Sequence, residues 1–275
     1  MTECSLTNIG SCIVEQLFES LLRLLNLQII PLMNLIESLL IQPVNIDLFL
    51  SLWTIIIYML SLFYGILLLV AGVRFTVSGY SPEQREKAKK SLTNIIIMMI
   101  LIQISFFLYS LSLEIFSSLT AAIFNMIDNS FFYITLDGLT NIGLELSLSF
   151  IYVAVLIVMI IFLVLRYICV AFGVIFFPIG IFFYFFEPLH SYGKLIINYL
   201  LTIMSLPFFY VLIFLVSSML LDVGIFGNFK IILMIGSFCL VIVSTLLLIL
   251  FVAVKAALTI AGPVSKITKL VGSLT

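Results

Sequence analysis

The sequence predicts an all-α, polytopic integral membrane protein with about five transmembrane helices, and three observations lead to this class. Of its 275 residues, 64% are hydrophobic and only 9% are charged, whereas soluble domains carry roughly 25% charged residues. The mean hydropathy is +1.36. The apolar runs are continuous and about twice the ~10 residues of a transmembrane β-strand, so helices rather than a closed barrel satisfy the backbone in lipid.

Residues 1–47 predict amphipathic helices outside the membrane. In 13–25, polar side chains share one helical face and apolar side chains the other. A second helix is expected to begin at Pro31, because proline suits a first helical turn. These helices are expected to lie along the interface or to pack on neighbouring subunits; ordinary loop-capping helices are the alternative. Cys4 and Cys12 either form a disulfide or remain two free thiols.

Six uncharged runs of 20 or more residues follow, and each is long enough to span, since ~20 residues cross the hydrocarbon core. The runs are 48–73, 91–113, 146–165, 167–186, 195–221 and 231–254.

The distribution of Lys and Arg decides which runs cross the membrane. The densest basic cluster follows the first run, which places that loop in the cytoplasm and the N-terminus outside. If all six runs crossed, seven cations would lie inside and five outside. If 167–186 instead enters and leaves on the cytoplasmic side, only Arg23 and Lys230 lie outside. The ten cations then inside are Arg74, Arg85, Lys87, Lys89, Lys90, Arg166, Lys194, Lys255, Lys266 and Lys269.

The segment 167–186 is therefore predicted to be re-entrant, and Gly173, Pro178 and Gly180 are expected to interrupt its helix. Such a break is tolerated at membrane depth only where protein or a water-filled cavity surrounds it. The protein is expected to lie in the plasma membrane, with its C-terminus in the cytoplasm. Its expected organisation has five parts. The parts are external helices 1–47, a transmembrane hairpin 48–113, an external amphipathic segment 114–145, a bundle 146–254 and a cytoplasmic tail 255–275.

The turn between the first two spans contains residues typical of helix ends. Gly79 is expected to end the first helix, and Ser81, Pro82 and Gln84 to open the next as a capping box, so that 82–113 forms one helix. This turn is the candidate docking site for a cytoplasmic partner: an ATPase, anionic lipid and nucleic acid all fit its charge. Its cations are Arg74, Arg85, Lys87, Lys89 and Lys90.

A second group of candidate residues lies in and beside the re-entrant segment. This re-entrant or pore group comprises Arg166, Gly173, Pro178, Gly180 and Lys194. Arg166 separates two apolar runs; it either caps the third span and bonds backbone freed at the break, or acts as a snorkelling topology signal. Of the few amides in the runs, Asn94, Gln103 and Asn198 either bond helices together or line a pore.

The sequence contains no recognisable catalytic constellation. A nucleophile elbow, a phosphate-binding glycine loop, an HExxH pattern and metal-ligand spacing of Cys or His are all missing from it. We therefore expect no enzymatic activity, no catalytic residue, no metal and no cofactor.

Two stretches resemble known membrane proteins of type IV secretion. The first is Ala71-Gly72-Val73-Arg74-Phe75, Ser78-Gly79, Pro82-Glu83 and Glu86 to Leu92, which is similar to the cytoplasmic turn of two-helix conjugative pilins. The second is Arg166 to Pro178, Glu187-Pro188, Lys194 and Pro207, which resembles the arginine-to-proline stretch of the TrbL-type polytopic channel subunit. Together with the N-terminal helices the resemblance covers roughly 13–215. The isoleucine content and short loops look most like the archaeal branch, the CedA-type DNA-import membrane proteins.

The resemblance implies a subunit of a DNA translocation or import channel. It implies a homo-oligomer that works with small two-helix pilin-like membrane proteins and a cytoplasmic hexameric HerA-like ATPase, with single-stranded DNA as cargo and membrane lipids around it. The chain lacks the long soluble extensions of many bacterial members, which puts an external scaffold role in doubt. The alternatives are a stand-alone small-molecule transporter, disfavoured because we find no internal repeat, and a non-conducting pilin-assembly scaffold.

Overall fold

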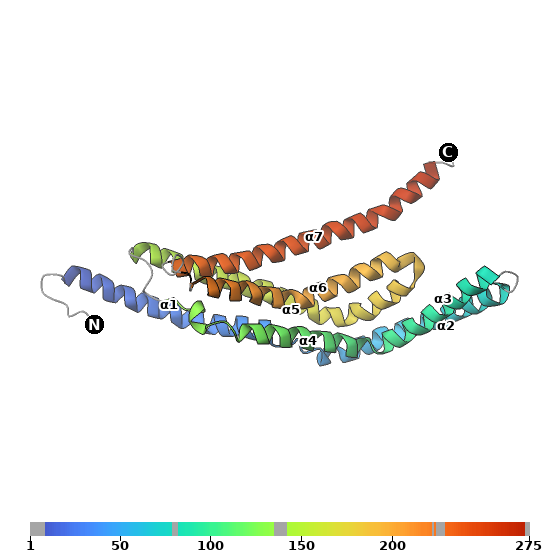
Figure 1. Ribbon diagram of the computed structural model, residues 1–275, viewed down its shortest axis with the longest axis horizontal. Coiled ribbons are helices and arrows are strands. Elements are labelled where there is room, and N and C mark those ends of the chain that lie inside the picture. Colours follow the sequence, from blue (N-terminus) through green and yellow to red (C-terminus); the bar gives the residue numbers. More distant parts are fainter. Residues whose placement is uncertain (1–8, 79–81, 135–141, 222, 224–228, 273–275) are drawn as a thin grey trace. The chain divides into compact units, whose positions relative to one another are not determined.

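The computed structural model describes residues 9–78, 82–134, 142–221, 223 and 229–272, and within them it is helical without a β-strand (Figure 1). The expected cap residues Gly79 and Ser81, and Cys4, lie outside these described residues. The helices are α1 (Ile9–Ile41), α2 (Leu50–Val77), α3 (Pro82–Gln103), α4 (Ser105–Phe124), α5 (Ile142–Phe185), α6 (His190–Leu221) and α7 (Lys230–Gly272). Short 3-10 helices are η1 (Asp47–Phe49), η3 (Asn129–Phe132) and η4 (Glu187–Leu189).

The prediction of an all-α chain with apolar helices of membrane-crossing length is confirmed. Within the described part of the chain, six helical stretches are long and apolar enough to span a bilayer. They are Arg23–Ile41, Asp47–Val77, Ser105–Phe124, Leu146–Phe185, Glu187–Leu221 and Lys230–Leu258. These stretches differ from the six uncharged runs of the sequence at three places. The N-terminal helix is added, the α3–α4 stretch is shifted, and the runs 146–165 and 167–186 form one stretch.

The chain divides into two compact units, each assembled from three separate stretches. Unit 1 comprises 1–42, 117–165 and 207–246. Unit 2 comprises 43–116, 166–206 and 247–275.

In unit 1, the helix expected to begin at Pro31 does not exist as a separate element. A single helix, α1, runs through Pro31 to Ile41. The buried side chains Ile29, Met33, Ile36 and Leu40 follow a spacing of four, three and four residues, so one packed face extends across the proline. Packing along this face outweighs the loss of one helical hydrogen bond, and the prediction of two helices was wrong.

A cluster of aromatic side chains lies in the core of unit 1. Phe214 and Phe238 approach to 4.6 Å between ring centroids, and Phe132 packs edge-on against both. The hydroxyl of Tyr152, a fully buried residue, donates to the carbonyl of Phe132 at 3.0 Å. Aromatic pairs of this kind contribute about 0.5–1.5 kcal/mol beyond the area they bury, and the tyrosine bond fixes η3 against α5.

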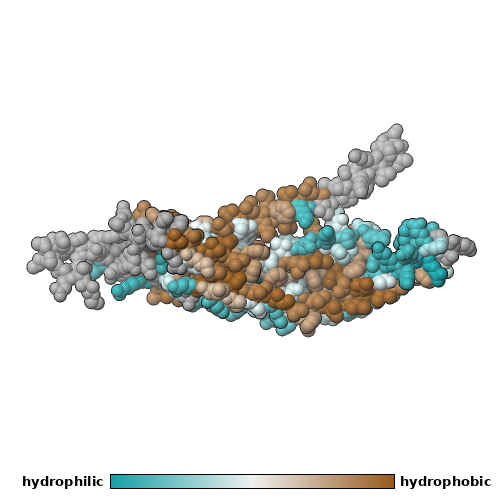
Figure 2. All heavy atoms as spheres, viewed as in Figure 1, coloured by the Kyte–Doolittle hydropathy of each residue, from teal (hydrophilic) through white to brown (hydrophobic). Residues whose placement is uncertain are grey.

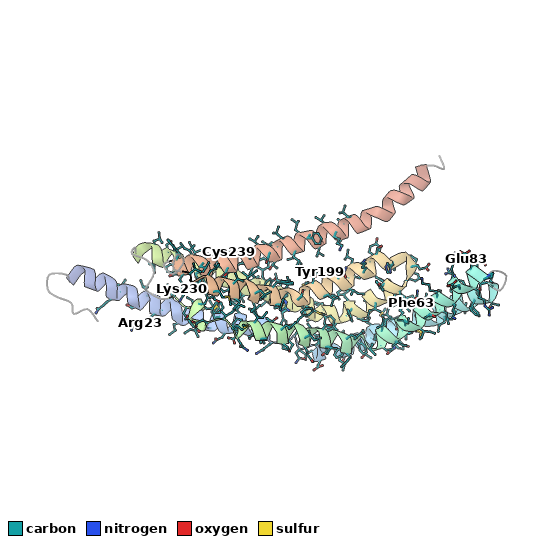
Figure 3. The ribbon with its side chains drawn as sticks, in the orientation of Figure 1. Arg23, Phe63, Glu83, Tyr199, Lys230 and Cys239 are labelled. Atoms are coloured by element: carbon teal, nitrogen blue, oxygen red, sulfur yellow. The ribbon has the colours of Figure 1, made fainter. Side chains whose placement is uncertain are left out.

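The loop that follows α4 is held by two further polar bonds. Asp128 accepts the backbone N–H of Ser130 at 2.9 Å, which lowers the pKa of this exposed carboxyl. Lys230, the first residue of α7 (Figure 3), donates its Nζ proton to the carbonyl of Ser130 at 2.7 Å. One short turn thus connects α4 with α7.

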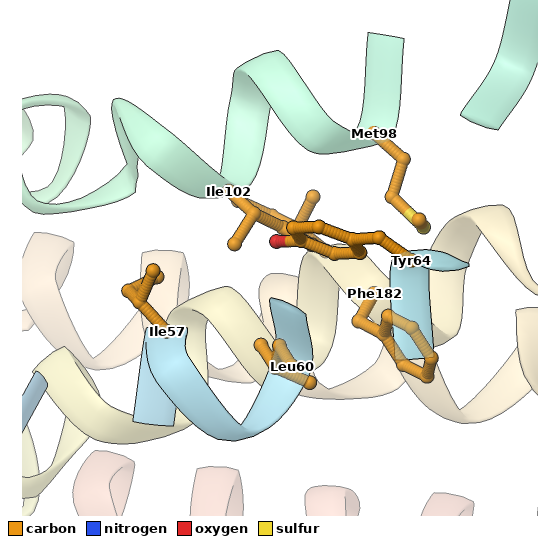
Figure 4. Packing of buried hydrophobic residues seen from close by; sticks show 7 residues of the cluster. Ile57, Leu60, Tyr64, Met98, Ile102 and Phe182 are labelled. Carbon is orange, nitrogen blue, oxygen red and sulfur yellow. The ribbon is translucent and has the colours of Figure 1, made fainter. Parts of the chain in front are cut away.

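The core of unit 2 joins α2, α3 and α5. Leu60 and Tyr64 of α2, Met98 and Ile102 of α3 and Phe182 of α5 are all buried in it (Figure 4). The indole N–H of Trp53 donates to the buried Ser105 hydroxyl at 2.9 Å and so ties the start of α2 to the start of α4.

The helix predicted for 82–113 extends further than expected. Helical hydrogen bonds continue across the junction of α3 and α4, since Ile104 bonds to Ile100 at 3.1 Å and Leu108 to Ile104 at 3.0 Å. Helical structure then persists to Phe124. The external amphipathic segment expected over 114–145 therefore does not begin as a separate element: its first eleven residues belong to α4.

The expected interruption at Gly173, Pro178 and Gly180 is also absent. Helix α5 has 44 residues and runs without a break from Ile142 through Pro178 to Phe185. The chain reverses only at 186–189, before α6 begins at His190. In lipid a broken helix would leave backbone groups without hydrogen-bond partners. Glycine and proline, which often end helices in soluble proteins, therefore lie within a continuous helix here.

Candidate functional site

Arg166 is the charged residue inside the apolar stretch Leu146–Phe185 of α5, and its guanidinium contacts the backbone of α6. Its Nε donates to the carbonyl of Ile203 at 3.2 Å, and its Nη2 lies 3.5 Å from the carbonyl of Met204. All three residues belong to unit 2, and the guanidinium is partly buried.

Pro207 explains why these carbonyls take a side-chain donor. In an α-helix the carbonyl of Ile203 would accept the N–H of residue 207, but proline has no N–H, and its ring disturbs the preceding turn. Arg166 supplies a donor in place of the missing one. We call the arrangement of Arg166, Ile203 and Pro207 the arginine clasp. The backbone freed by a proline is thus in α6, and not at a break within α5 as the sequence predicted.

The glycines of the re-entrant or pore group pack against neighbouring helices. A methyl group added at Gly173 would collide with the Tyr109 hydroxyl, and one at Gly180 would come within 2.9 Å of Ile196. Both glycines and Pro178 are buried, while Lys194 is exposed at the start of α6. These positions allow close helix packing, which is the usual role of small residues between membrane helices.

The reversal that brings α6 back along α5 depends on a third glycine. A Cβ atom at Gly193 would overlap the backbone of Phe183 and Tyr184. This close approach sets the register of the hairpin, and the register in turn places Ile203 beside Arg166.

Tyr109 is a residue that sequence reasoning missed. It lies on α4, is 1% exposed, and donates its hydroxyl proton to the carbonyl of Val170 on α5 at 2.6 Å. Its ring packs on Phe177 at 5.5 Å. Gly173 leaves the space that the hydroxyl occupies. A tyrosine in the middle of an apolar run was the available signal, because a buried tyrosine usually finds a hydrogen-bond partner.

Tyr64 provides a contrast within the same unit. It is 6% exposed in the core of α2, α3 and α5, yet its hydroxyl has no hydrogen-bond partner among the described residues (Figure 4). An unsatisfied buried hydroxyl costs free energy of folding.

The candidate docking cations lie at the end of the α2–α3 hairpin, where Figure 2 shows hydrophilic side chains gathered. All of them are exposed: Arg74, Arg85, Lys87, Lys89 and Lys90. Arg85 lies over the ring of Phe75 at 5.9 Å, and Lys87 pairs with Glu83 at 2.8 Å. Glu83 marks this end of the hairpin in Figure 3.

A metal site is not formed by the described residues, among which no cluster of three or more His, Cys, Asp or Glu occurs. Comparison of the chain with protein-family models, with curated proteins and with solved structures found no significant match. The site is therefore defined by its own geometry: a guanidinium, two tyrosines and the Ile203 carbonyl, all in unit 2.

The arginine clasp predicts that Arg166 and Pro207 are energetically coupled. Replacing Arg166 by Leu leaves the Ile203 carbonyl without its donor and should lower the free energy of unfolding by about 1–3 kcal/mol. Pro207→Ala restores a backbone N–H, so Arg166→Leu should cost about 1 kcal/mol less in that background. A double-mutant cycle in detergent micelles measures this coupling.

Pro178 provides the matched control for this cycle. Arg166→Leu and Pro178→Ala should be additive, because the two residues lie twelve positions apart on α5, about 18 Å along the helix. Equal coupling to both prolines, or none to Pro207, would contradict the clasp. Arg166→Lys should rescue only part of the loss, since lysine has no planar fork of donors.

The two buried tyrosines predict opposite responses to loss of a hydroxyl. Tyr109→Phe removes a hydrogen bond and should lower the free energy of unfolding by about 0.5–1.5 kcal/mol. Tyr64→Phe removes a hydroxyl without a partner and should leave stability unchanged or increase it. Thermal unfolding of both variants in one detergent checks the difference, and a larger loss for Tyr64→Phe would contradict the assigned contacts.

Proposed function

We propose that the chain is a membrane subunit of a larger translocation assembly, a channel or platform of a conjugation-like DNA translocation or DNA import machine. This function follows from the resemblance to TrbL-type subunits of type IV secretion. One physical observation, the length of α5, supports an assembly over a stand-alone protein.

Helix α5 contains more apolar length than one bilayer can cover. Its stretch Leu146–Phe185 has 40 residues, or about 60 Å of helix against ~30 Å of hydrocarbon. Even a tilt of about 40° accommodates only about 26 residues, so about 14 residues lie outside the hydrocarbon. The chain leaves large side chains exposed along the helix, among them Ile157, Ile161 and Phe172. Other subunits would cover the excess.

The charges support an orientation with the N-terminus outside and the C-terminus in the cytoplasm. The stretches of unit 2 contain ten of the twelve cations, and those of unit 1 contain only Arg23 and Lys230. The eight acids of unit 1 and five of unit 2 give formal charges of −6 and +5. This is the asymmetry of the positive-inside rule if unit 2 carries the cytoplasmic ends. In this proposal α5 continues beyond the membrane, and 167–206 forms a helical hairpin on the cytoplasmic side.

The partners in this proposal follow from the same arrangement. Copies of the chain and small two-helix pilin-like proteins would cover the apolar surface, and the basic α2–α3 hairpin would face a hexameric HerA-like ATPase. Single-stranded DNA would be the cargo. A stand-alone transporter fits less well, because its apolar length would have nothing to cover it. A non-conducting pilin-assembly scaffold would also have its apolar surface covered by other subunits, and it differs from the channel only in conductance.

The orientation is tested by cysteine labelling in a variant whose four native cysteines are replaced by serine. Asn125→Cys, exposed after α4, should react with a membrane-impermeant maleimide on intact cells. Lys194→Cys should react only after permeabilisation. The reverse pattern would overturn the proposed orientation and the cytoplasmic hairpin with it.

The assembly and its activity are tested on the purified chain. We expect an oligomer in mild detergent and, after fusion into planar bilayers, discrete conductance that single-stranded DNA blocks. A monomer without conductance would contradict the channel. Solute uptake by a monomer would favour the transporter, and a silent oligomer would favour the scaffold.

A further inference from the structure

The cations of the α2–α3 hairpin separate into two groups with different surroundings. Arg74, Lys89 and Lys90 form the first group, which we call the collar. Arg74 directly follows the apolar run 48–73, and Lys89 and Lys90 directly precede the run 91–113. The second group, which we call the head, is the first helical turn and a half of α3, residues 82–87.

The packing of the hairpin places the collar at one level. Helices α2 and α3 contact each other along their length, and Arg85 lies over the Phe75 ring at 5.9 Å. In an antiparallel pair with this register, Lys89 and Lys90 lie about one helical turn below Phe75, toward the apolar run. Ala71 and Ala88, both buried, fit the same register. The collar is therefore a band about one turn deep where the uncharged runs of the two helices end.

Charge distinguishes the collar from the head. The head contains Arg85 and Lys87 but also Glu83 and Glu86, so its formal charge is zero. Lys87 is moreover paired with Glu83 at 2.8 Å. The collar contains three exposed cations and no acid, and none of the three has an ion-pair partner among the described residues. The net positive charge of the hairpin thus lies where its apolar surface ends.

We propose that the collar binds the anionic headgroups of phospholipids in the adjacent leaflet. Phosphate groups of a bilayer lie just beyond the hydrocarbon, at the level where α2 and α3 change from apolar to basic. Lysine and arginine stems extend along apolar surface while their charged ends reach the headgroups. A protein or nucleic acid partner would reach the exposed head first, and the head offers it no net charge. This proposal does not depend on whether the chain forms a channel.

The test compares two variants that lose the same charge from the same helix. The full chain is reconstituted into vesicles of phosphatidylcholine with phosphatidylglycerol, and native mass spectrometry measures the ratio of the two lipids retained. The parent chain should retain phosphatidylglycerol preferentially. The collar variant Lys89→Gln/Lys90→Gln should lose about 10–25-fold in this preference, since each cation near an anionic surface contributes about fivefold. Adding Arg74→Gln should abolish it.

The head variant Arg85→Gln/Lys87→Gln is the matched control. It should keep its preference within about threefold, because Glu83 and Glu86 balance its two charges. Arg85 also lies about one helical turn further from the headgroups than Lys89, where salt screens it. All substituted side chains are exposed, so circular dichroism and elution volume should match the parent. A parent chain without lipid preference, or an equal loss in both variants, would overturn the proposal. A collar variant that keeps its preference would also overturn it and would leave these cations to a protein or nucleic acid.

Discussion

A carbonyl that loses its helical donor among apolar side chains cannot turn to water, and Ile203 carries such a carbonyl. Pro207 removes the donor, and Arg166 on α5 replaces it at 3.2 Å. The cost of burying part of a guanidinium and the cost of an orphaned carbonyl are each several kcal/mol in hydrocarbon. The guanidinium and the carbonyl satisfy each other's hydrogen bonding. The charge in α5 and the proline in α6 are therefore stable together.

The same constraint applies to three further polar side chains of the two units. Tyr109 bonds the backbone of Val170, Tyr152 that of Phe132, and the Ser117 hydroxyl bonds the last carbonyl of α1. In each case a side chain of one element bonds the main chain of another. A chain with few polar side chains thus uses them to fix the register between helices, because dispersion contacts alone change little when one apolar helix slides along its neighbour.

The sequence predicted the helical class and most apolar stretches, because composition and run length alone determine them. The predicted helix boundaries were wrong where rules for proline and glycine in soluble helices were used for helices in lipid. Pro31 and Pro178 were expected to begin or break helices, yet α1 and α5 continue through them, since a break would leave more backbone groups unpaired than the proline itself does. Gly173 and Gly180 were also predicted to interrupt α5, and they instead admit close neighbours.

The partner of Arg166 was beyond sequence reasoning for a different reason. Its charge and isolation marked it as important, but Ile203 lies 37 residues away. Their meeting depends on the turn at 186–189 and on the backbone contact at Gly193, which together set the hairpin register. A shift of a single residue would turn a different face of α6 toward Arg166. No local pattern around Arg166 records that register.

The clasp also constrains how Arg166 would take part in transport. To face a polyanion, the guanidinium would have to leave Ile203, and the freed carbonyl would need another donor. Water entering the site would provide it and would solvate the guanidinium as well. Release of Arg166 and hydration of its surroundings are therefore linked, because each lowers the cost of the other. In the dry, packed arrangement Arg166 joins α5 to α6, and only a hydrated state would make it available to cargo.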